Sequence, residues 1–224
     1  MFYIKNVNTA RIEFFYKFID SLISENNTHS IIEIGCGEGW LSEKILSNHQ
    51  IKLTMVDIID QRKTLLDADF MCADCSTSRL NINDSSVDLL IATQVIEHLE
   101  NPSFFFNEAK RVLKEGGYLL LSYPNFSNIF QRLHFLQSGT IYRLSGTLNS
   151  GGHINFITER HLLNFLKNDF ELIQSQGDML ALTGKVPRIL SFFDKQFQDK
   201  HVLIPFFKST LFSYNVNSLF KKSR

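Results

Sequence analysis

The chain has 224 residues, of which 44% are hydrophobic and 21% are charged. A chain of this length buries enough apolar surface to fold as one ordinary domain with an appendage, without disulfides or a structural metal. Lys plus Arg and Asp plus Glu both total 23, which argues against a protein held on nucleic acid by an overall basic field. Three cysteines, two of them in CADC, fit a reducing compartment better than a secreted disulfide framework.

The ends of the chain differ from its middle. The first residues lack the pattern of a signal peptide, and no uncharged apolar run approaches the ~18 residues of a membrane span, so we expect a cytoplasmic protein. Residues 186–224 hold seven basic and two acidic side chains together with many aromatic ones. We expect this appendage to pack on the domain, cover the site or form a dimer contact; a peripheral contact with an anionic membrane is the alternative.

The elements predicted along the chain alternate between helices and strands. The first, at residues 9–23, is an amphipathic helix with apolar side chains at helical spacing. Short apolar runs typical of buried parallel strands follow at 30–35, 51–57, 69–74, 87–93 and 118–124. Segments between these runs predict helices at 40–48, 60–66 and 102–113, the last with Asn101 as its N-cap.

The later part of the chain completes an α/β pattern. Residues 125–157 form a less regular insert that we expect to cover the acceptor site, and a helix follows near Thr158. FELIQSQ and DMLALTG predict two last strands that pair antiparallel at one edge. The fold class is therefore a Rossmann-like doubly wound sheet of seven strands, mostly parallel with one antiparallel edge strand, and helices on both faces. We divide the chain into a helical segment 1–28, a domain 29–185 and an appendage 186–224.

The stretch IIEIGCGEGW, residues 31–40, places a glycine-rich turn between the first strand and the first helix of the sheet. Such a turn lets a ligand approach the main chain. The dinucleotide fingerprint would need its third glycine where Trp40 stands, and Glu38 would face the pyrophosphate. At about 4 Å this repulsion costs on the order of 1–4 kcal/mol, which disfavours a phosphate ligand.

A cationic cofactor such as S-adenosylmethionine reverses this argument, because its ammonium group suits an acid near the turn. Glu33 would accept from that ammonium. Asp57 ends the second strand, where an acid accepts from both ribose hydroxyls. Asp74 ends the third strand, where it would accept from the adenine amino group. The alternative is that the glycines only make a tight turn and the aspartates only cap helices.

Five motifs carry a resemblance to a known family. EIGCGEG, VDI, ADC, VDLLIATQVIEHLENP and LKEGGYLLLSYPN resemble, in order, the motifs of class I S-adenosylmethionine-dependent methyltransferases. The resemblance implies that the glycine turn binds the methionine part, Asp57 the ribose, Asp74 with Cys75 the adenine, and Thr93 with Gln94 the floor beneath the sulfonium. The implied cofactor residues are Glu33, Gly35, Cys36, Gly37, Gly39, Trp40, Asp57, Ile58, Asp74, Cys75, Thr93 and Gln94.

The segment QVIEH offers catalytic candidates. Gln94, Glu97 and His98 stand at i, i+3 and i+4 and would share one face of a helix. His98 would act as general base for a hydroxyl nucleophile, with His153 and Gln94 as further catalytic candidates. The alternative is that Glu97 and His98 only support the following helix.

QVIEH also resembles the ExxEH segment of ubiquinone-type O-methyltransferases and small-RNA 2′-O-methyltransferases, whose acid and histidine bind a divalent metal together with a later histidine. The corresponding residues here are Glu97, His98 and His153. Gln94 replaces the first acid and is a weaker ligand for a hard cation, so a divalent metal is not expected.

These observations predict a methyltransferase that acts on oxygen of a small-molecule, glycan-like or lipid-linked acceptor. Two alternatives stay open. One is 2′-O-methylation of RNA, which the acidic body of the chain disfavours. The other is a cofactor-binding regulatory or scaffold protein without catalysis, which the replacement by Gln94 supports. An NAD-linked dehydrogenase ranks last.

Overall fold

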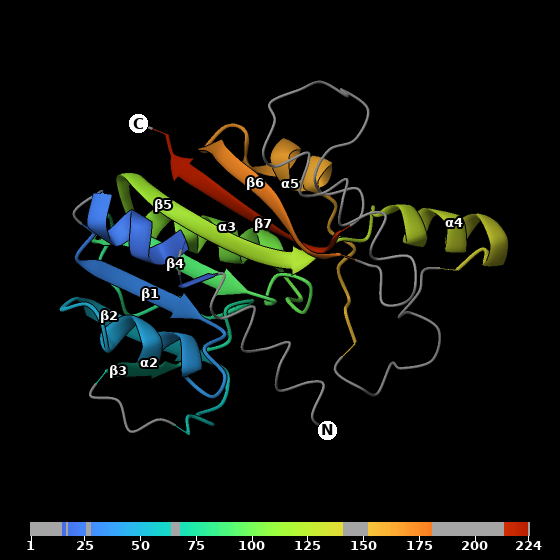
Figure 1. The fold of residues 1–224 in the computed structure, drawn as a ribbon. Coiled ribbons are helices and arrows are strands. Elements are labelled where there is room, and N and C mark those ends of the chain that lie inside the picture. Colours follow the sequence, from blue (N-terminus) through green and yellow to red (C-terminus); the bar gives the residue numbers. More distant parts are fainter. Residues whose placement is uncertain are drawn as a thin grey trace.

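The fold is known from a computed structural model that describes residues 15, 16, 18–25, 28–63, 68–140, 152–180 and 213–223, with the backbone alone at 178–180 and 214. One seven-stranded sheet runs through the molecule in the order β3-β2-β1-β4-β5-β7-β6. Figure 1 shows helices on both faces of this sheet. The expected Rossmann-like doubly wound architecture is therefore confirmed.

Five parallel strands form the part of the sheet that the motifs predicted. They are β1 (Ser30–Ile34), β2 (Lys52–Asp57), β3 (Asp69–Cys72), β4 (Val87–Thr93) and β5 (Leu113–Pro124). The strand order runs outward from β1 through β2 to β3 on one side and from β4 to β5 on the other. This reversal between β1 and β4 is the switch point where α/β sheets of this kind bind their ligands.

The last two strands differ from the prediction. FELIQSQ and the start of DMLALTG belong to one strand, β6 (Phe170–Leu180), and the seventh strand is β7 (Ser213–Lys222) in the C-terminal appendage. β7 pairs antiparallel with β5 on one side and β6 on the other, so the antiparallel strand is second from the edge. Polar residues in SYNVNS hide the alternation expected of a strand.

Helices cover the two faces of the sheet with separate cores. Residues 15, 16 and 18–25, the described part of the first helix, lie with α2 (Trp40–Leu46) on one face, where Ile19 and Ile45 are fully buried. On the other face α3 (Pro102–Val112) and α5 (Glu159–Leu166) bury Phe105 and Leu162. Asn101 caps α3 as expected, and Thr158 caps α5, because each side chain accepts a hydrogen bond from a backbone N–H in the first turn.

The segments 60–66 and 125–157 are each described only in part. The helix expected at 60–66 is absent from residues 60–63, and 64–67 lie outside the described residues. The insert contains one helix, α4 (Ile129–Ser138), before 141–151, which also lie outside them. Within the part of the chain that the structure describes, no helix is long and apolar enough to cross a membrane.

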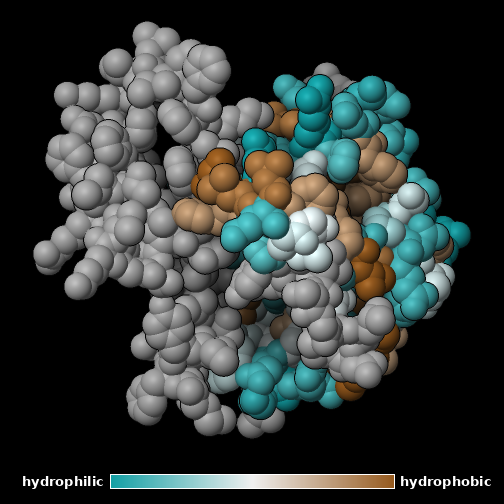
Figure 2. Space-filling model, turned by 90° about the vertical axis from the view of Figure 1, so that its right-hand side faces the viewer, coloured by the Kyte–Doolittle hydropathy of each residue, from teal (hydrophilic) through white to brown (hydrophobic). Residues whose placement is uncertain are grey.

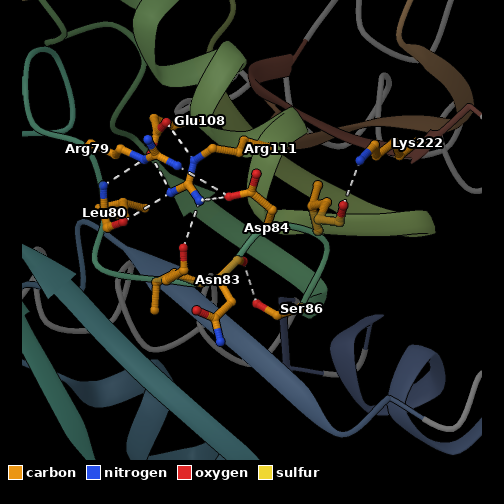
Figure 3. Close-up of polar contacts among 10 residues, drawn as sticks. Arg79, Leu80, Asn83, Asp84, Ser86, Glu108, Arg111 and Lys222 are labelled. Atoms are coloured by element: carbon orange, nitrogen blue, oxygen red, sulfur yellow. Dashed lines mark hydrogen bonds and ion pairs between the residues drawn. The ribbon is translucent and has the colours of Figure 1, made fainter.

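Arg111 ties the loop before β4 to α3 (Figure 3). Its guanidinium donates to the backbone oxygens of Ile82 and Leu80 at 2.7 and 3.0 Å, and it forms ion pairs with Glu108 at 2.8 Å and Asp84 at 2.5 Å. Arg111 and Glu108 are largely buried. This network fixes the connection from β3 to β4, and with it the start of the strand that leads to the candidate site.

Candidate active site

The glycine turn follows β1 at the carboxyl edge of the sheet. The backbone N–H groups of Gly35 and Cys36 both donate to the oxygen of Val56 in β2, at 2.8 and 3.2 Å. Gly35, Gly37 and Gly39 have φ of +71°, +53° and +84°, a region that side chains disfavour. Glycine at these three positions is therefore needed for the path of the backbone. A tight turn that binds no ligand, which is the alternative, would need the same glycines.

Gly35 has a second reason to be glycine. A Cβ atom built on it would lie 2.3 Å from Cγ2 of Val95, in the turn that follows β4. Gly37 has nothing within 4 Å of the corresponding position, so its side facing the crevice is open. The glycine turn thus packs directly against the turn that carries the catalytic candidates, a contact that the motif spacing alone did not reveal.

Asp57 connects the glycine turn to the end of β2. Its Oδ2 accepts from the N–H of Gly37 at 2.8 Å, and its Oδ1 accepts from the N–H of Ile58 at 2.7 Å. Each carboxylate oxygen has a second lone pair, so these bonds leave acceptor capacity for ribose hydroxyls. Asp57 lies where the sequence expected it and also orders the turn.

Glu33 is almost fully buried in the central strand β1. It accepts a hydrogen bond from the hydroxyl of Ser42 in α2. Burial raises the pKa of Glu33 from 4.5 to about 7, and the hydrogen bond from Ser42 opposes that rise only in part. Glu33 lies in β1 two residues before Gly35. A cationic ligand near its carboxyl group would favour the ionised form.

Glu38 behaves differently from the expectation based on charge repulsion. Its carboxylate forms an ion pair with Lys63 and accepts from Nε1 of Trp40 at 2.7 Å. Lys63 compensates the charge that was expected to repel a pyrophosphate, which weakens that argument against a phosphate ligand. Trp40 is 48% exposed at the start of α2, beside the turn.

The remaining cofactor candidates lie at the ends of β2 and β3. Asp74 accepts from the N–H of Ser76 at 2.8 Å and from the hydroxyl of Thr77 at 3.3 Å, so it caps its own turn as the alternative required. Cys75 is buried, which raises the pKa of its thiol to about 12 and excludes a thiolate role near neutrality. Ile58 is 60% exposed at the crevice edge.

The segment QVIEH forms a turn and not the expected helix, since α3 begins only at Pro102. Gln94 has φ of +56°, and its amide nitrogen donates to the hydroxyl of Ser122 at 3.3 Å. This bond directs the amide of Gln94 to β5. Thr93, the last residue of β4, is partly buried beside it.

Glu97, His98 and His153 come together although 55 residues separate the two histidines. One ligand atom from each residue lies within 4.8 Å of the others. The rings of His98 and His153 meet edge to face with centroids 4.9 Å apart, and the ring of Phe126 also meets that of His153 edge to face, with centroids 5.7 Å apart. The cluster combines a buried carboxyl group with two imidazoles, of which that of His98 is exposed to solvent.

Residues 154 and 155 hold His153 against the turn after β4. The backbone N–H groups of Ile154 and Asn155 both donate to the oxygen of Glu97, at 2.9 and 3.0 Å. The side-chain amide of Asn155 donates to the oxygens of Ile96 and Leu99, at 3.1 and 2.5 Å. Sequence reasoning singled out His153 but missed Asn155; its place two residues after His153 was the only available signal.

The geometry defines the class of protein: a Rossmann-like sheet with a glycine turn at its switch point, an acid after each of the next two strands, and a polar cluster after the fourth. Solved structures share this fold. The plantazolicin methyltransferase BpumL, solved with S-adenosylhomocysteine and a triazolic desmethylPZN analog, matches with a TM-score of 0.59 at 16% identity over 96% of this chain and 84% of its own. A methyltransferase from Clostridium acetobutylicum matches with a TM-score of 0.58 at 13% identity over 93% and 91%.

A family described as a methyltransferase domain matches residues 7–175, and the chain belongs to it as a class I S-adenosylmethionine-dependent methyltransferase. A malonyl-[acyl-carrier protein] O-methyltransferase from Haemophilus ducreyi is 30% identical over 168 residues, 70% of this chain and 58% of the relative. A probable S-adenosylmethionine-dependent methyltransferase from Mycolicibacterium smegmatis is 32% identical over 98 residues, 42% and 38% of the two chains. The chain thus spans about 58% and 38% of the length of these relatives.

Proposed function

We propose that the protein transfers the methyl group of S-adenosylmethionine to an oxygen of a small-molecule, glycan-like or lipid-linked acceptor. The observation that supports this best is the cluster of Glu97, His98 and His153, which follows β4 and whose turn packs on the glycine turn through Val95 and Gly35. A sulfonium is already a good leaving group. Transfer therefore needs an aligned nucleophile and an acceptor for its proton more than further activation.

For a hydroxyl acceptor, His98 would take the proton. His98 is exposed to solvent, whereas the neighbouring Glu97 is buried, and the rings of His98 and His153 meet edge to face. This arrangement suits a general base that is held in orientation by its neighbours.

A carboxylate acceptor would use the same cluster differently. The Haemophilus ducreyi relative is named for O-methylation of malonyl-[acyl-carrier protein], whose acceptor is a carboxyl group. A carboxylate is already ionised near neutrality and needs no base. His98 and His153 would then bind the carboxylate through ring N–H groups, and neither would take a proton from it.

As a second candidate, the cluster of Glu97, His98 and His153 would bind a divalent metal. This differs from the expectation that the replacement of an acid by Gln94 disfavours a metal. The donor set of one carboxylate and two imidazoles lies within 4.8 Å, and it suits Zn²⁺, Mn²⁺ or Fe²⁺ better than Mg²⁺. Glu97, His98 and His153 would hold the ion, which would polarise an acceptor oxygen. Gln94, bonded to Ser122, takes no part in this set.

The cofactor half of the proposal is tested by calorimetry with S-adenosylmethionine and S-adenosylhomocysteine. Asp57→Ala removes a carboxylate expected to accept from two hydroxyls, so affinity should fall at least about tenfold. Asp69→Ala is the matched control, because Asp69 is exposed at the opposite end of β3. Folded protein that binds neither compound would overturn the cofactor assignment.

The acceptor half is tested by methyl transfer to phenols, sugars and malonyl thioesters. His98→Ala and His153→Ala should abolish transfer with cofactor affinity unchanged, and His161→Ala, an exposed histidine on α5, should behave as wild type. Transfer to a phenol or sugar alone would identify a hydroxyl acceptor, and transfer to a malonyl thioester alone a carboxylate acceptor. Cofactor binding without transfer to any oxygen would favour the non-catalytic alternative, and salt-dependent transfer to RNA the RNA one.

The metal is tested separately, by titrating Mn²⁺ and Zn²⁺ into folded protein. Tight binding that His153→Ala removes and His161→Ala leaves intact would support a metal centre. The absence of binding would leave His98 as a base or as an acceptor ligand.

A further inference from the structure

The helix α4 presents large apolar side chains to solvent. Phe130, Leu133, Phe135 and Leu136 are 37%, 55%, 52% and 81% exposed, and none of the helix residues Ile129–Ser138 is buried. Single exposed apolar residues are ordinary on protein surfaces, whereas four on one ten-residue helix mark a surface that contacts something. α4 therefore needs an explanation beyond the stability of the domain.

α4 is anchored firmly at its first end. Asn128 caps the helix by accepting from the N–H of Gln131, and the buried Asn125 donates to the oxygen of Ser213 at 3.0 Å. From this anchor at the ends of β5 and β7 the helix extends away from the sheet (Figure 1). Figure 2 views the molecule from the α4 side and shows hydrophobic side chains gathered near the middle of that face.

The distribution of the apolar groups favours a lipid surface over a protein groove. A helix that docks into a groove carries one apolar stripe. On α4, Phe130 and Phe135 are five positions apart and thus about 140° apart around the axis. Apolar groups on both sides of a projecting helix suit immersion of its end among lipid headgroups and acyl chains.

The charge of the chain around α4 also favours an anionic lipid surface. The chain has no Asp or Glu between Glu115 and Glu159, although it has 23 acidic residues in all. Arg132 lies on α4 and donates from Nε to the oxygen of Ser127 at 2.7 Å, which leaves the rest of its guanidinium able to contact phosphate. If α4 packed on α4 of a second copy around a two-fold axis near Arg132, the two arginines would face each other, which is less favourable than contact with an anionic surface.

We propose that α4 is a peripheral lipid contact that binds anionic bilayers through Leu133, Phe135 and Leu136, with Arg132 among the phosphate groups. The surface follows directly from β5, whose carboxyl end borders the candidate site, so a bound bilayer would lie beside the crevice. This inference does not depend on the proposed reaction.

The test is sedimentation of the full chain with phosphatidylcholine vesicles prepared with and without phosphatidylglycerol. Wild type should bind the anionic vesicles and bind the neutral ones more weakly. Leu133→Ser/Leu136→Ser should bind at least about tenfold more weakly, because two apolar side chains lose their burial in lipid. Ile173→Ser is the control, since Ile173 is 48% exposed on the edge strand β6, and it should bind as wild type.

Cofactor affinity and circular dichroism establish that each variant is folded. Three results would overturn the proposal: folded wild type that ignores anionic vesicles, an α4 variant that binds them as well as wild type does, or a wild-type dimer that the α4 substitutions dissociate without any vesicle binding. The second result would move the lipid contact to another surface, and the third would assign α4 to contact between copies of the chain.

Discussion

Glu33 links folding and cofactor binding to pH. Its pKa is raised from 4.5 to about 7 by burial, so between these values the folded protein holds a proton that the unfolded chain has lost. The free energy of unfolding therefore falls as pH rises through this window, by up to about 3 kcal/mol. Glu33→Gln should remove the fall and raise the melting temperature at pH 8 relative to wild type.

Thermal unfolding between pH 4 and 9 measures this effect, with the exposed Glu115→Gln as a control. The same Glu33→Gln change should weaken binding of S-adenosylmethionine above pH 7, because only the ionised carboxyl group attracts an ammonium. Identical pH slopes for wild type and Glu33→Gln would show that the buried carboxyl group does not titrate in this window.

Gly35 and Gly37 have similar backbone angles but different surroundings. Alanine at either position is strained by about 1–2 kcal/mol because φ is positive. Gly35→Ala also places its methyl group 2.3 Å from Val95, whereas Gly37→Ala meets nothing within 4 Å. Gly35→Ala should therefore be the more destabilising in urea unfolding, and Val95→Ala should recover part of that difference in the double variant. Equal costs for the two alanines would refute the contact.

The positions of the proposed cofactor residues were predictable because their signals are local. Gly35, Asp57 and Asp74 each follow a strand by a fixed spacing, so parallel pairing alone brings them to one edge. His153 lies 55 residues after His98 in the chain, and the two meet because the segment around His153 packs on the turn after β4. The hydrogen bonds from the side chain of Asn155 to Ile96 and Leu99 hold that segment in place. Local patterns do not specify such a return.

At the scale of elements, Arg111 holds α3 to the loop before β4. Arg111→Ala would leave the oxygens of Leu80 and Ile82 without this donor and the carboxyl group of Glu108 with only the N–H of Leu80, which should cost about 2–4 kcal/mol in urea unfolding. Arg79→Ala is the control, since Arg79 is 70% exposed and contacts Asp84 at 3.4 Å. It should change stability by less than about 0.5 kcal/mol.

The Arg111 experiment also has a pH readout. The hydrogen bond from Arg111 lowers the pKa of Glu108, so its contribution is present above the ordinary carboxyl pKa and is lost as pH falls through the lowered value. Wild type should lose stability in acid more steeply than Arg111→Ala. Parallel acid profiles would mean that the ion pair contributes no net stability.

At the scale of the whole molecule, the chain's last strand completes the sheet between two earlier ones. β7 buries Val216, Leu219 and Phe220 against both cores, and its polar Ser218 joins Tyr123 at 3.1 Å and Ser175 at 3.3 Å through hydroxyl contacts. The hydroxyl partners come from β5 and β6, and they make a polar strand compatible with burial. Neither partner was visible in the segment itself, which explains why it was assigned to an appendage.

A chain that ends at Phe212 should consequently fail to fold, although it retains every cofactor motif. Without β7, β5 and β6 lose their shared partner and expose two rows of backbone hydrogen-bonding groups, so we expect no cooperative thermal transition and no S-adenosylmethionine binding. A chain that ends at Lys222 keeps β7 whole and should unfold like the full protein. A cooperative transition in the shorter chain would instead mean that residues 29–185 form an autonomous domain. Adding a peptide of residues 213–224 to the shorter chain should restore binding of S-adenosylmethionine, because the peptide supplies the one missing strand, which pairs with β5 and β6.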